Sequence, residues 1–305
     1  MTTLDTLVNM TRRRLLSDLR EEYDNLVSNV PANATSLNLQ NGSGLALGSI
    51  RAGSLLEVDY ELYFVTSTPV SIGAISVIPG YYGSPSTAHA AGAVVTVNPR
   101  FPRNDLIDAI NEDIDDLSAP ANGLYRMLET TLVYNPVRIG YDLPGVKAGQ
   151  VLEIFEVRNQ DYGPAQAWPL LAPRKYKLER NADPVQFPSG ISLKFYGAGY
   201  PGRPIRVQYK AAFNSNLANP SDDVTLLTGL HPEAHDIPTL GAAIRLVEYR
   251  DIKRSFSEAQ SEPRRAQEVP VGASMTSLKG LLDRRTKRIE AERARLDKQY
   301  PRQLR

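Results

Sequence analysis

The sequence predicts an α+β protein that is mostly β, with a small β unit flanked by helices, then a β-sandwich-like domain and a long C-terminal helix. Three patterns support this fold class. Residues 55–65 alternate apolar and polar side chains, as a half-buried strand does. Short runs of β-forming residues, separated by Pro and Gly, recur between residues 124 and 255. Apolar residues at steps of four and seven indicate a helix over residues 274–305.

The same patterns predict the domain boundaries. No helix of the βαβ type separates the short β runs, so a parallel α/β fold is not expected. The chain divides into an N-terminal helix (1–30), a small β unit with a closing helix (34–117), a β-sandwich-like domain (124–255), a linker (256–273) and a basic C-terminal helix (274–305).

The composition is that of a chain with two modest domains. The 305 residues carry a formal net charge of +1, so a charge-driven partner must bind a local patch. The chain has no Cys, which excludes disulfides, thiolate metal sites and a Cys nucleophile. We find no signal-peptide pattern at the N-terminus and no apolar run near the roughly 20 residues that span a bilayer. No membrane partner is therefore expected.

The N-terminal helix is predicted from Thr2 to about Val27, with Thr2 and Asp5 as a capping box. An apolar stripe at helical spacing lies beside a basic turn at residues 12–14. This turn is either a solvated surface with internal ion pairs or a docking surface for an acidic neighbour. The candidate docking residues are Val8, Arg12, Leu15, Leu19 and Tyr23.

The small β unit continues with strands at Ile75–Ile78 and Val94–Val97 and closes with a helix from Asp105 to Leu117. Because this helix has a clean apolar side, its acids are predicted to face solvent. As an alternative, they could receive a basic helix from a neighbouring subunit. The acids concerned are Asp105, Asp108, Glu112, Asp113 and Asp116.

The β-sandwich-like domain is predicted from about six short strands with turn signals between them. They lie near residues 130–134, 151–157, 176–178, 191–196, 205–209 and 244–247. Residues 239–254 fit a helix nearly as well as a strand, and the sequence leaves both alternatives open. The polar, Pro-containing stretch that follows is predicted to be a linker.

The C-terminal helix has a narrow apolar stripe and a strong positive charge. Ten Lys or Arg and four acids lie between Met275 and Arg305, a net charge of about +6. So thin a stripe cannot stabilise a helix alone, so the helix must pack on its own domain, on another subunit or on an acidic partner. The candidate docking residues are Leu278, Leu282, Arg284, Arg285, Arg288, Ile289, Arg293, Leu296 and Tyr300.

No catalytic or metal-binding constellation is recognisable, so the chain is not expected to be an enzyme or to bind a cofactor. Pro232 separates His231 from His235, and no Glu follows His231 as a zincin motif requires. His89 has no evident carboxylate partner and is interpreted as structural. No helix start follows the Gly-rich stretch 197–202, which argues against a phosphate site.

A series of segments, mostly within residues 34–117, resembles a known family. The segments are Ala34–Leu39, Gly48–Ser49, Leu55–Val65, Val77–Gly83, Ala88–Gly92, Pro99–Phe101 and Asp105–Asn111, together with Glu290–Leu296 and Tyr300–Pro301 near the C-terminus. They resemble virion structural proteins of tailed bacteriophages, and the nearest group is the neck, or head-to-tail connector and adaptor, proteins. The region 124–255 resembles no family that we can name.

The resemblance implies a non-enzymatic protein that forms a homo-oligomeric ring, often twelvefold in this family, under the portal protein in the virion neck. It implies docking through terminal helices, contacts with further neck or tail proteins, and a place in the virion after assembly in the host cytoplasm. Many adaptors are mainly helical, whereas this chain has two β-rich regions. A tail or baseplate component is therefore an alternative.

Two further function classes remain open. Trp168 and the many Tyr of the β-rich second half suggest a glycan-binding or glycan-cleaving module, because sugars stack on exposed aromatic rings. The basic C-terminal helix is the one candidate for contacts with packaged DNA, and such binding would weaken steeply with salt. The assembly hypothesis itself assumes that both terminal helices lack their full complement of apolar and ionic partners within one chain.

Overall fold

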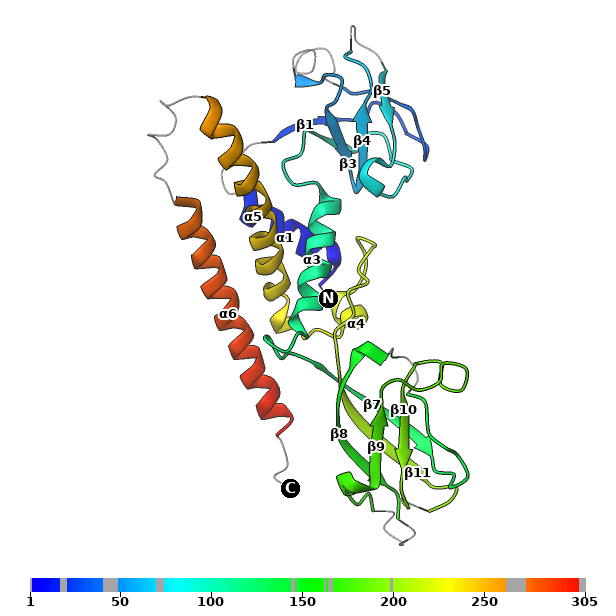
Figure 1. The fold of residues 1–305 in the computed structure, drawn as a ribbon. Helices are drawn as coiled ribbons and strands as arrows, with labels where there is room; N and C mark the ends of the chain where they lie inside the picture. The colour runs from blue at the N-terminus through cyan, green and yellow to red at the C-terminus, as the bar shows by residue number, and fades with distance from the viewer. Residues whose placement is uncertain are drawn as a thin grey trace. The chain divides into compact units, whose positions relative to one another are not determined.

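The structure is a computed structural model that describes residues 2–16, 21–40, 49–69, 74–143, 146, 148–161, 163, 167–197, 200–261 and 273–301. It contains both helices and strands, so the predicted α+β class is confirmed (Figure 1). The chain forms two compact units. Unit 1 comprises Met1–Asp113, Leu217–Asp223 and His235–Thr286, and unit 2 comprises Ile114–Asn216, Val224–Ala234 and Lys287–Arg305.

Unit 1 contains one curled antiparallel sheet with the strand order β1-β6-β3-β4-β5-β2. Its strands are β1 (Glu22–Asn25), β2 (Ser36–Leu37), β3 (Leu55–Val58), β4 (Glu61–Val65), β5 (Ile75–Ile78) and β6 (Val94–Val97). The stretch 55–65, predicted as one strand, is instead the β3–β4 hairpin. Asp59 makes this turn possible because it adopts a φ of 53°, a left-handed conformation that short polar residues tolerate best.

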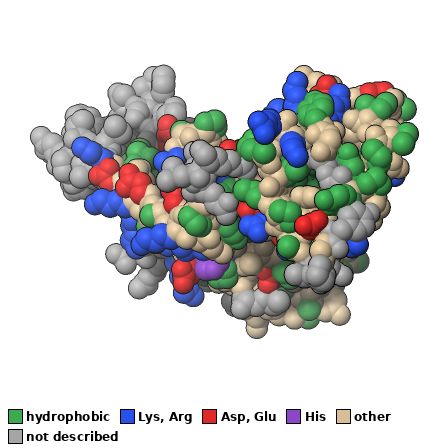
Figure 2. Space-filling model, turned by 90° about the horizontal axis from the view of Figure 1, so that it is seen from below, with side chains coloured by type: hydrophobic (Ala, Val, Ile, Leu, Met, Phe, Trp, Pro, Cys, Tyr) green, Lys and Arg blue, Asp and Glu red, His purple; other side chains and the backbone are tan. Residues whose placement is uncertain are grey.

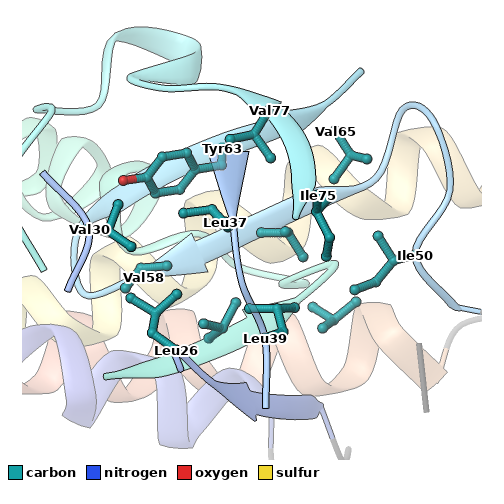
Figure 3. Packing of buried hydrophobic residues seen from close by; sticks show 13 residues of the cluster. Leu26, Val30, Leu37, Leu39, Ile50, Val58, Tyr63, Val65, Ile75 and Val77 are labelled. Atoms are coloured by element: carbon teal, nitrogen blue, oxygen red, sulfur yellow. The ribbon is translucent and has the colours of Figure 1, made fainter. Parts of the chain in front are cut away.

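The core of this sheet consists of aliphatic side chains and one tyrosine (Figure 3). Leu56 and Val58 from β3 lie in it with Val65 from β4, and all three are fully buried. Leu26 and Val30, which follow β1, close one side of the core. Hydrophobic burial of this kind is the main stabilising term for a small sheet.

The helices of unit 1 include α1 (Leu4–Leu16), α5 (Asp236–Ser261) and most of α3 (Arg103–Leu117). α1 packs against α5 and buries Leu4, Leu7 and Val8. The predicted N-terminal helix over 1–30 is therefore too long. Residues 22–25 form strand β1 and pair antiparallel with β6, and a helix could not make these hydrogen bonds.

The second half of the chain also departs from the predicted boundaries. The ambiguous stretch 239–254 is helical, and the α5 helix continues into the predicted linker as far as Ser261. Residues 262–272 lie outside the described residues. Because α5 packs on α1, it belongs to unit 1 and not to the domain predicted over 124–255.

Unit 2 contains a three-stranded antiparallel sheet, β7-β11-β8, and a β9–β10 hairpin. The strands are β7 (Arg126–Val133), β8 (Val151–Asn159), β9 (Tyr176–Glu179), β10 (Ser192–Phe195) and β11 (Pro204–Ala211). Val157 and Val207 from the larger sheet share one core with Leu193 from the hairpin. The short helix α4 (Val224–Thr228) and the last part of α6 (Ala273–Gln299) complete this unit. Short 3₁₀ turns are η1 (Tyr81–Gly83), η2 (Ala148–Gln150), η3 (Pro173–Lys175) and η4 (Pro232–Ala234).

Arg12 attaches α1 to the sheet through buried ion pairs. Its guanidinium donates to Glu21 Oε2 at 2.6 Å and to Glu57 Oε2 at 3.2 Å. The Glu57 side chain is only 2% exposed, and its other oxygen accepts the Arg103 amide at 2.5 Å. Burial raises the pKa of Glu57 above its ordinary value of 4.5, although Arg103 and Arg12 act in the opposite direction. Glu57 therefore depends on these partners to be charged inside the fold.

Replacing Arg12 tests this dependence. Arg12→Met should lower the free energy of unfolding by ~3–5 kcal/mol near neutral pH, because Glu57 is left buried without its closest cation, Arg12, and keeps only Arg103 at 4.0 Å. The folded-state pKa of Glu57 lies above its unfolded value, so protonation favours the folded state. The deficit should therefore shrink as the pH falls towards 4.5, and urea denaturation across this pH range measures it.

Arg13 provides the matched control because it is the exposed neighbour of Arg12. Arg13→Met should change the free energy of unfolding by less than ~0.5 kcal/mol at any pH in this range. A small deficit for Arg12→Met, or one that grows as the pH falls, would contradict the assigned role of Arg12.

Candidate docking surfaces

The apolar stripe of α6 is covered by the chain in one part and open in another. Ile289 and Leu296 are buried, and the Tyr300 ring meets Phe155 edge-on with centroids 6.3 Å apart. Leu282 lies on the same stripe, two helical turns before Ile289, yet 44% of it is exposed. The expectation that the whole stripe needs an external partner is wrong at Ile289 and Leu296. For the stretch around Leu282 and the half-buried Leu278, the need for an external partner stays a prediction.

Several cations predicted to dock α6 on a partner are engaged within the chain. Arg285 Nη2 lies 2.8 Å from Asp113 Oδ1 in unit 1, and Arg288 Nη2 donates to the Glu233 carbonyl at 2.7 Å in unit 2. Arg293 is exposed, but its guanidinium packs against the backbone at Gly123. Each of these contacts also fixes which side of the helix faces its own chain.

The exposed side of α6 carries both signs of charge. Between residues 278 and 300, the exposed ionisable side chains are Lys279, Asp283, Arg284, Lys287, Glu290, Arg293, Asp297 and Lys298. By helix geometry, Arg284, Lys287 and Lys298 lie on one side of the helix, and the acids Asp283, Glu290 and Asp297 lie together on the adjacent side. Binding to a phosphate backbone uses several adjacent cations, and among the exposed cations between residues 278 and 300 only Arg284 and Lys287 are neighbours on the helix surface.

The acidic residues of α3 divide into two groups. Asp105, Asp108 and Glu112 are exposed, as predicted, and Asp116 is half-buried, with its carboxylate accepting the Asn122 amide at 3.1 Å. Asp113 is only 1% exposed, so its predicted place on the solvent face is wrong.

Asp113 is buried where α3 meets α5 and α6 in unit 1. Its carboxylate lies directly against Gly241 of α5, where a Cβ would overlap it. Arg285 of α6 and, at 3.9 Å, Arg245 of α5 supply the opposite charge. The basic helix that this acid receives is therefore the chain's own α6, not one from a neighbouring subunit.

The residues predicted to dock the N-terminal helix are mostly used inside unit 1. Val8 is fully buried, Arg12 is held by Glu21 and Glu57, and Leu15 is half-buried. Docking of another molecule through Val8 or Arg12 is therefore excluded for the folded unit.

The remaining two residues of that predicted set do not lie on α1. Tyr23 is 53% exposed, but it belongs to strand β1. Leu19 lies outside the described residues. α1 therefore offers no continuous apolar stripe for another molecule among the residues that the structure describes.

His89 forms a buried cluster that the sequence did not reveal. Its Nδ1 lies 2.8 Å from Asp59 Oδ2 and its Nε2 lies 3.0 Å from Glu61 Oε2. Glu61 also accepts the backbone N–H groups of Gly80 and Thr87 at 3.1 and 2.9 Å. The expectation that His89 lacks a carboxylate partner is thus wrong. The hydrogen bonds of this cluster hold the loop after β5 against the sheet. The imidazole and the Glu61 carboxylate are fully buried, so a substrate cannot reach them.

Unit 1 also contains a cleft of about 610 Å³. Arg12, Arg13 and Arg103 line it, but so do Glu57 and Asp59. Unit 2 has a cleft of about 850 Å³ in which Lys210 and Arg293 lie with Glu153 and Asp297. The charges of both signs in each cleft do not match the single sign of a phosphate-rich ligand.

Unit 2 exposes several large apolar side chains. Val137 and Ile139, in the loop after β7, are 85% and 72% exposed, and Val185 is 88% exposed. Tyr196 and Tyr200, in the connection between β10 and β11, are also exposed. Figure 2 shows hydrophobic side chains gathered beside Lys and Arg on one part of the visible surface. Where exposed apolar side chains gather into a patch, they usually mark a site of protein association.

Trp168 is poorly placed to bind a sugar. The Arg206 guanidinium lies 4.6 Å from the centre of its ring and also pairs with Glu129 at 3.1 Å. One face of the indole is therefore occupied by a cation–π contact. A glycan platform needs that face free.

The histidine pair does not form a metal site. His231 is exposed and its Nδ1 accepts the Glu233 N–H at 3.3 Å, whereas His235 is buried. Across the described residues, no three or more His, Cys, Asp or Glu side chains gather as metal ligands would. None of the helices within the described ranges has both the length and the apolar character of a membrane span.

Comparisons with known proteins add no relative from which a function could be transferred. No family model matches the sequence, no curated protein matches it, and no solved structure matches the fold. A function for this chain is therefore inferred from its own surfaces and from the family resemblance of its sequence.

The contact between Asp113 and Gly241 can be tested with a pair of glycine substitutions. Gly241→Ala should destabilise unit 1 by ~1–3 kcal/mol, because the added methyl group overlaps the buried carboxylate. Gly280→Ala in α6 has open space around the new methyl group and should stabilise the protein by up to ~1 kcal/mol through helix propensity. Thermal unfolding of both variants measures the difference, and equal effects would contradict the close approach of α3 to α5.

Proposed function

We propose that this chain is a non-enzymatic structural protein of a tailed-phage virion, and that it forms an oligomeric ring at the head–tail junction as a connector or adaptor. Its partners in this proposal are further copies of itself, the portal protein and other neck or tail proteins. The family resemblance over residues 34–117 suggests the setting. The surfaces of α6 and unit 2 suggest how the chain is held there.

The observation that carries the proposal is that the chain buries one part of the apolar stripe of α6 and leaves another part exposed. Ile289 and Leu296 are buried by their own chain, whereas Leu282 remains 44% exposed on the same side of the helix. Covering the exposed 44% of this leucine with a partner contributes roughly 1 kcal/mol, because full burial of a leucine contributes about 1.5–3 kcal/mol. We therefore assign docking to residues 278–286 of α6, and not to α1.

The charges around this part of α6 favour a helix that can change partners. Arg285 is attracted by Asp113, but Arg284 lies near Arg14 of α1. Burial and the charge of Arg284 lower the pKa of Arg14, which means that the folded state bears a like-charge repulsion there. Attraction and repulsion at adjacent residues leave this part of α6 less firmly held than its buried ion pair alone would suggest.

The exposed apolar loops of unit 2 provide a second contact surface for ring neighbours. Val137 and Ile139 stand out from the loop after β7. The same features would serve a tail or baseplate component, and imaging of the particle separates these positions. The mixed charges of α6 disfavour a role in binding packaged DNA, and the Arg206 contact of Trp168 disfavours a glycan-binding module.

A complementation experiment tests the proposal. A phage that carries a nonsense codon in this gene should regain infectivity from a plasmid copy of the chain. Leu282→Lys should reduce the yield of joined particles by at least about tenfold, because a lysine cannot enter an apolar interface. Full heads and free tails should accumulate instead, and electron microscopy with an antibody to the chain should label the neck of wild-type particles.

Ala291→Lys is the matched control, because Ala291 is exposed on the opposite side of the same helix. It should support wild-type yields. Circular dichroism of both variants confirms that α6 is retained. Normal yields with Leu282→Lys, or labelling of a site away from the neck, would contradict the proposal.

A further inference from the structure

The three-stranded sheet of unit 2 has two edge strands, β8 and β7, and they differ in whether another segment pairs with them. Along β8, the Leu171 N–H donates to Val157 and the Asn159 N–H donates to Pro169, so the segment that follows β8 covers part of this edge. β7 pairs with β11 on one side only. No backbone hydrogen bond joins its other side to any residue that the structure describes.

The register shows which backbone groups of β7 point outward. The Tyr134 N–H donates to the Arg203 carbonyl at 2.8 Å, which continues the β7–β11 ladder. Along an antiparallel strand, residues whose N–H and C=O groups point towards one neighbouring strand (inward) alternate with residues whose groups point away from it (outward). Even-numbered residues of β7 therefore bond to β11, and odd-numbered residues direct their N–H and C=O groups to the open edge. Pro204, which has no N–H, lies opposite Val133 and fits this assignment.

The outward positions form an edge that is suited to pairing. They are Met127, Glu129, Thr131 and Val133, and the last three are exposed. β7 is eight residues long and contains no Pro, and its one charged outward residue, Glu129, forms an ion pair with Arg206 of its own neighbour β11 at 3.1 Å. Its last four residues, Thr130 to Val133, are good strand formers. An open edge of this length and composition is expected to accept another strand.

The sequence of β7 fits a second copy of itself. Consider two β7 strands that pair antiparallel about a twofold axis, with the two Thr130 residues directly opposite each other. Met127 then faces Val133 of the second copy, and Glu129 faces Thr131. All outward N–H and C=O groups are then paired. At the positions in between, Leu128 faces Leu132 and Thr130 faces Thr130, which are favourable cross-strand pairs.

The neighbouring registers are worse. An axis at Glu129 places two like charges directly opposite each other, which is destabilising. An axis at Thr131 leaves Met127 beyond the end of the partner strand. If one β7 strand shifts by one residue against the other, residues whose N–H and C=O groups point to β11 lie opposite residues whose groups point to the open edge. These residues cannot form a hydrogen-bonded ladder. Thr130 is therefore the favoured centre.

We propose that β7 is an interface between two free copies of this chain, which pair antiparallel about a twofold axis at Thr130 and extend the β7-β11-β8 sheet across both molecules. This goes beyond the proposed ring. Ring contacts join two different surfaces of neighbouring subunits, whereas this contact joins one surface to itself. The two proposals can therefore fail separately.

Because the chain has no Cys, a single introduced thiol reports the register. In the proposed dimer the two Thr130 residues form a pair without direct hydrogen bonds, with Cα atoms about 4.5 Å apart, within disulfide range. Thr130→Cys should form a covalent dimer under mild oxidation. Val133→Cys is the matched control on the same strand. Its two thiols would lie about 20 Å apart, so it should not cross-link.

A proline substitution tests the pairing without a thiol. Thr131→Pro removes an outward N–H and leaves the bonds to β11 intact, because edge strands tolerate proline at such positions. Sedimentation at about 100 µM should show dimer for the wild type and for Thr131→Val, but monomer for Thr131→Pro. Monomeric wild-type protein, or equal cross-linking of Thr130→Cys and Val133→Cys, would overturn the proposal.

Discussion

The ion pair between Asp113 and Arg285 determines which side of α6 faces its own chain. Asp113 is buried beside Gly241, and the missing Cβ there is what lets its carboxylate sit against α5. A buried carboxylate needs a cation, and Arg285 supplies it at 2.8 Å. Leu282 and Ile289 lie one turn to either side of Arg285 on the same helical side. The side of α6 that is fixed by this ion pair is thus the side that carries the apolar stripe, and Leu282 is the member of it that stays exposed.

Buried polar and charged side chains have a similar role elsewhere in unit 1. Arg12 joins α1 to β3 through Glu57, and His89 joins the loop after β5 to Asp59 and Glu61. Such groups cost desolvation energy, and they are tolerated because every one faces an opposite charge or a hydrogen-bond partner. They specify where elements meet, while the aliphatic core supplies most of the stabilisation. The docking surface proposed at residues 278–286 of α6 therefore lies on a unit that has an aliphatic core of its own.

The fold class could be predicted because period-two and period-3.6 patterns are local. The end of α1 could not, because Tyr23 fits helical spacing and only the pairing of residues 22–25 with β6, some 70 residues later, decides against a helix. The partners of His89 lie 30 and 28 residues before it, so no local pattern reveals them. Asp113 was expected in solvent because its burial depends on Gly241, more than 100 residues away. For α6, the stripe was evident from the sequence, but which of its residues the chain covers depends on packing that the sequence does not display.

The two parts of α6 differ in whether their own chain buries the apolar stripe, and amide hydrogen exchange measures this difference directly. In the free protein, the amides of residues 279–286 should exchange faster than those of residues 289–299, because only the latter part has its stripe buried. In assembled particles, both parts should be protected to the same extent. Uniform strong protection along α6 in the free protein, with no change on assembly, would contradict the account.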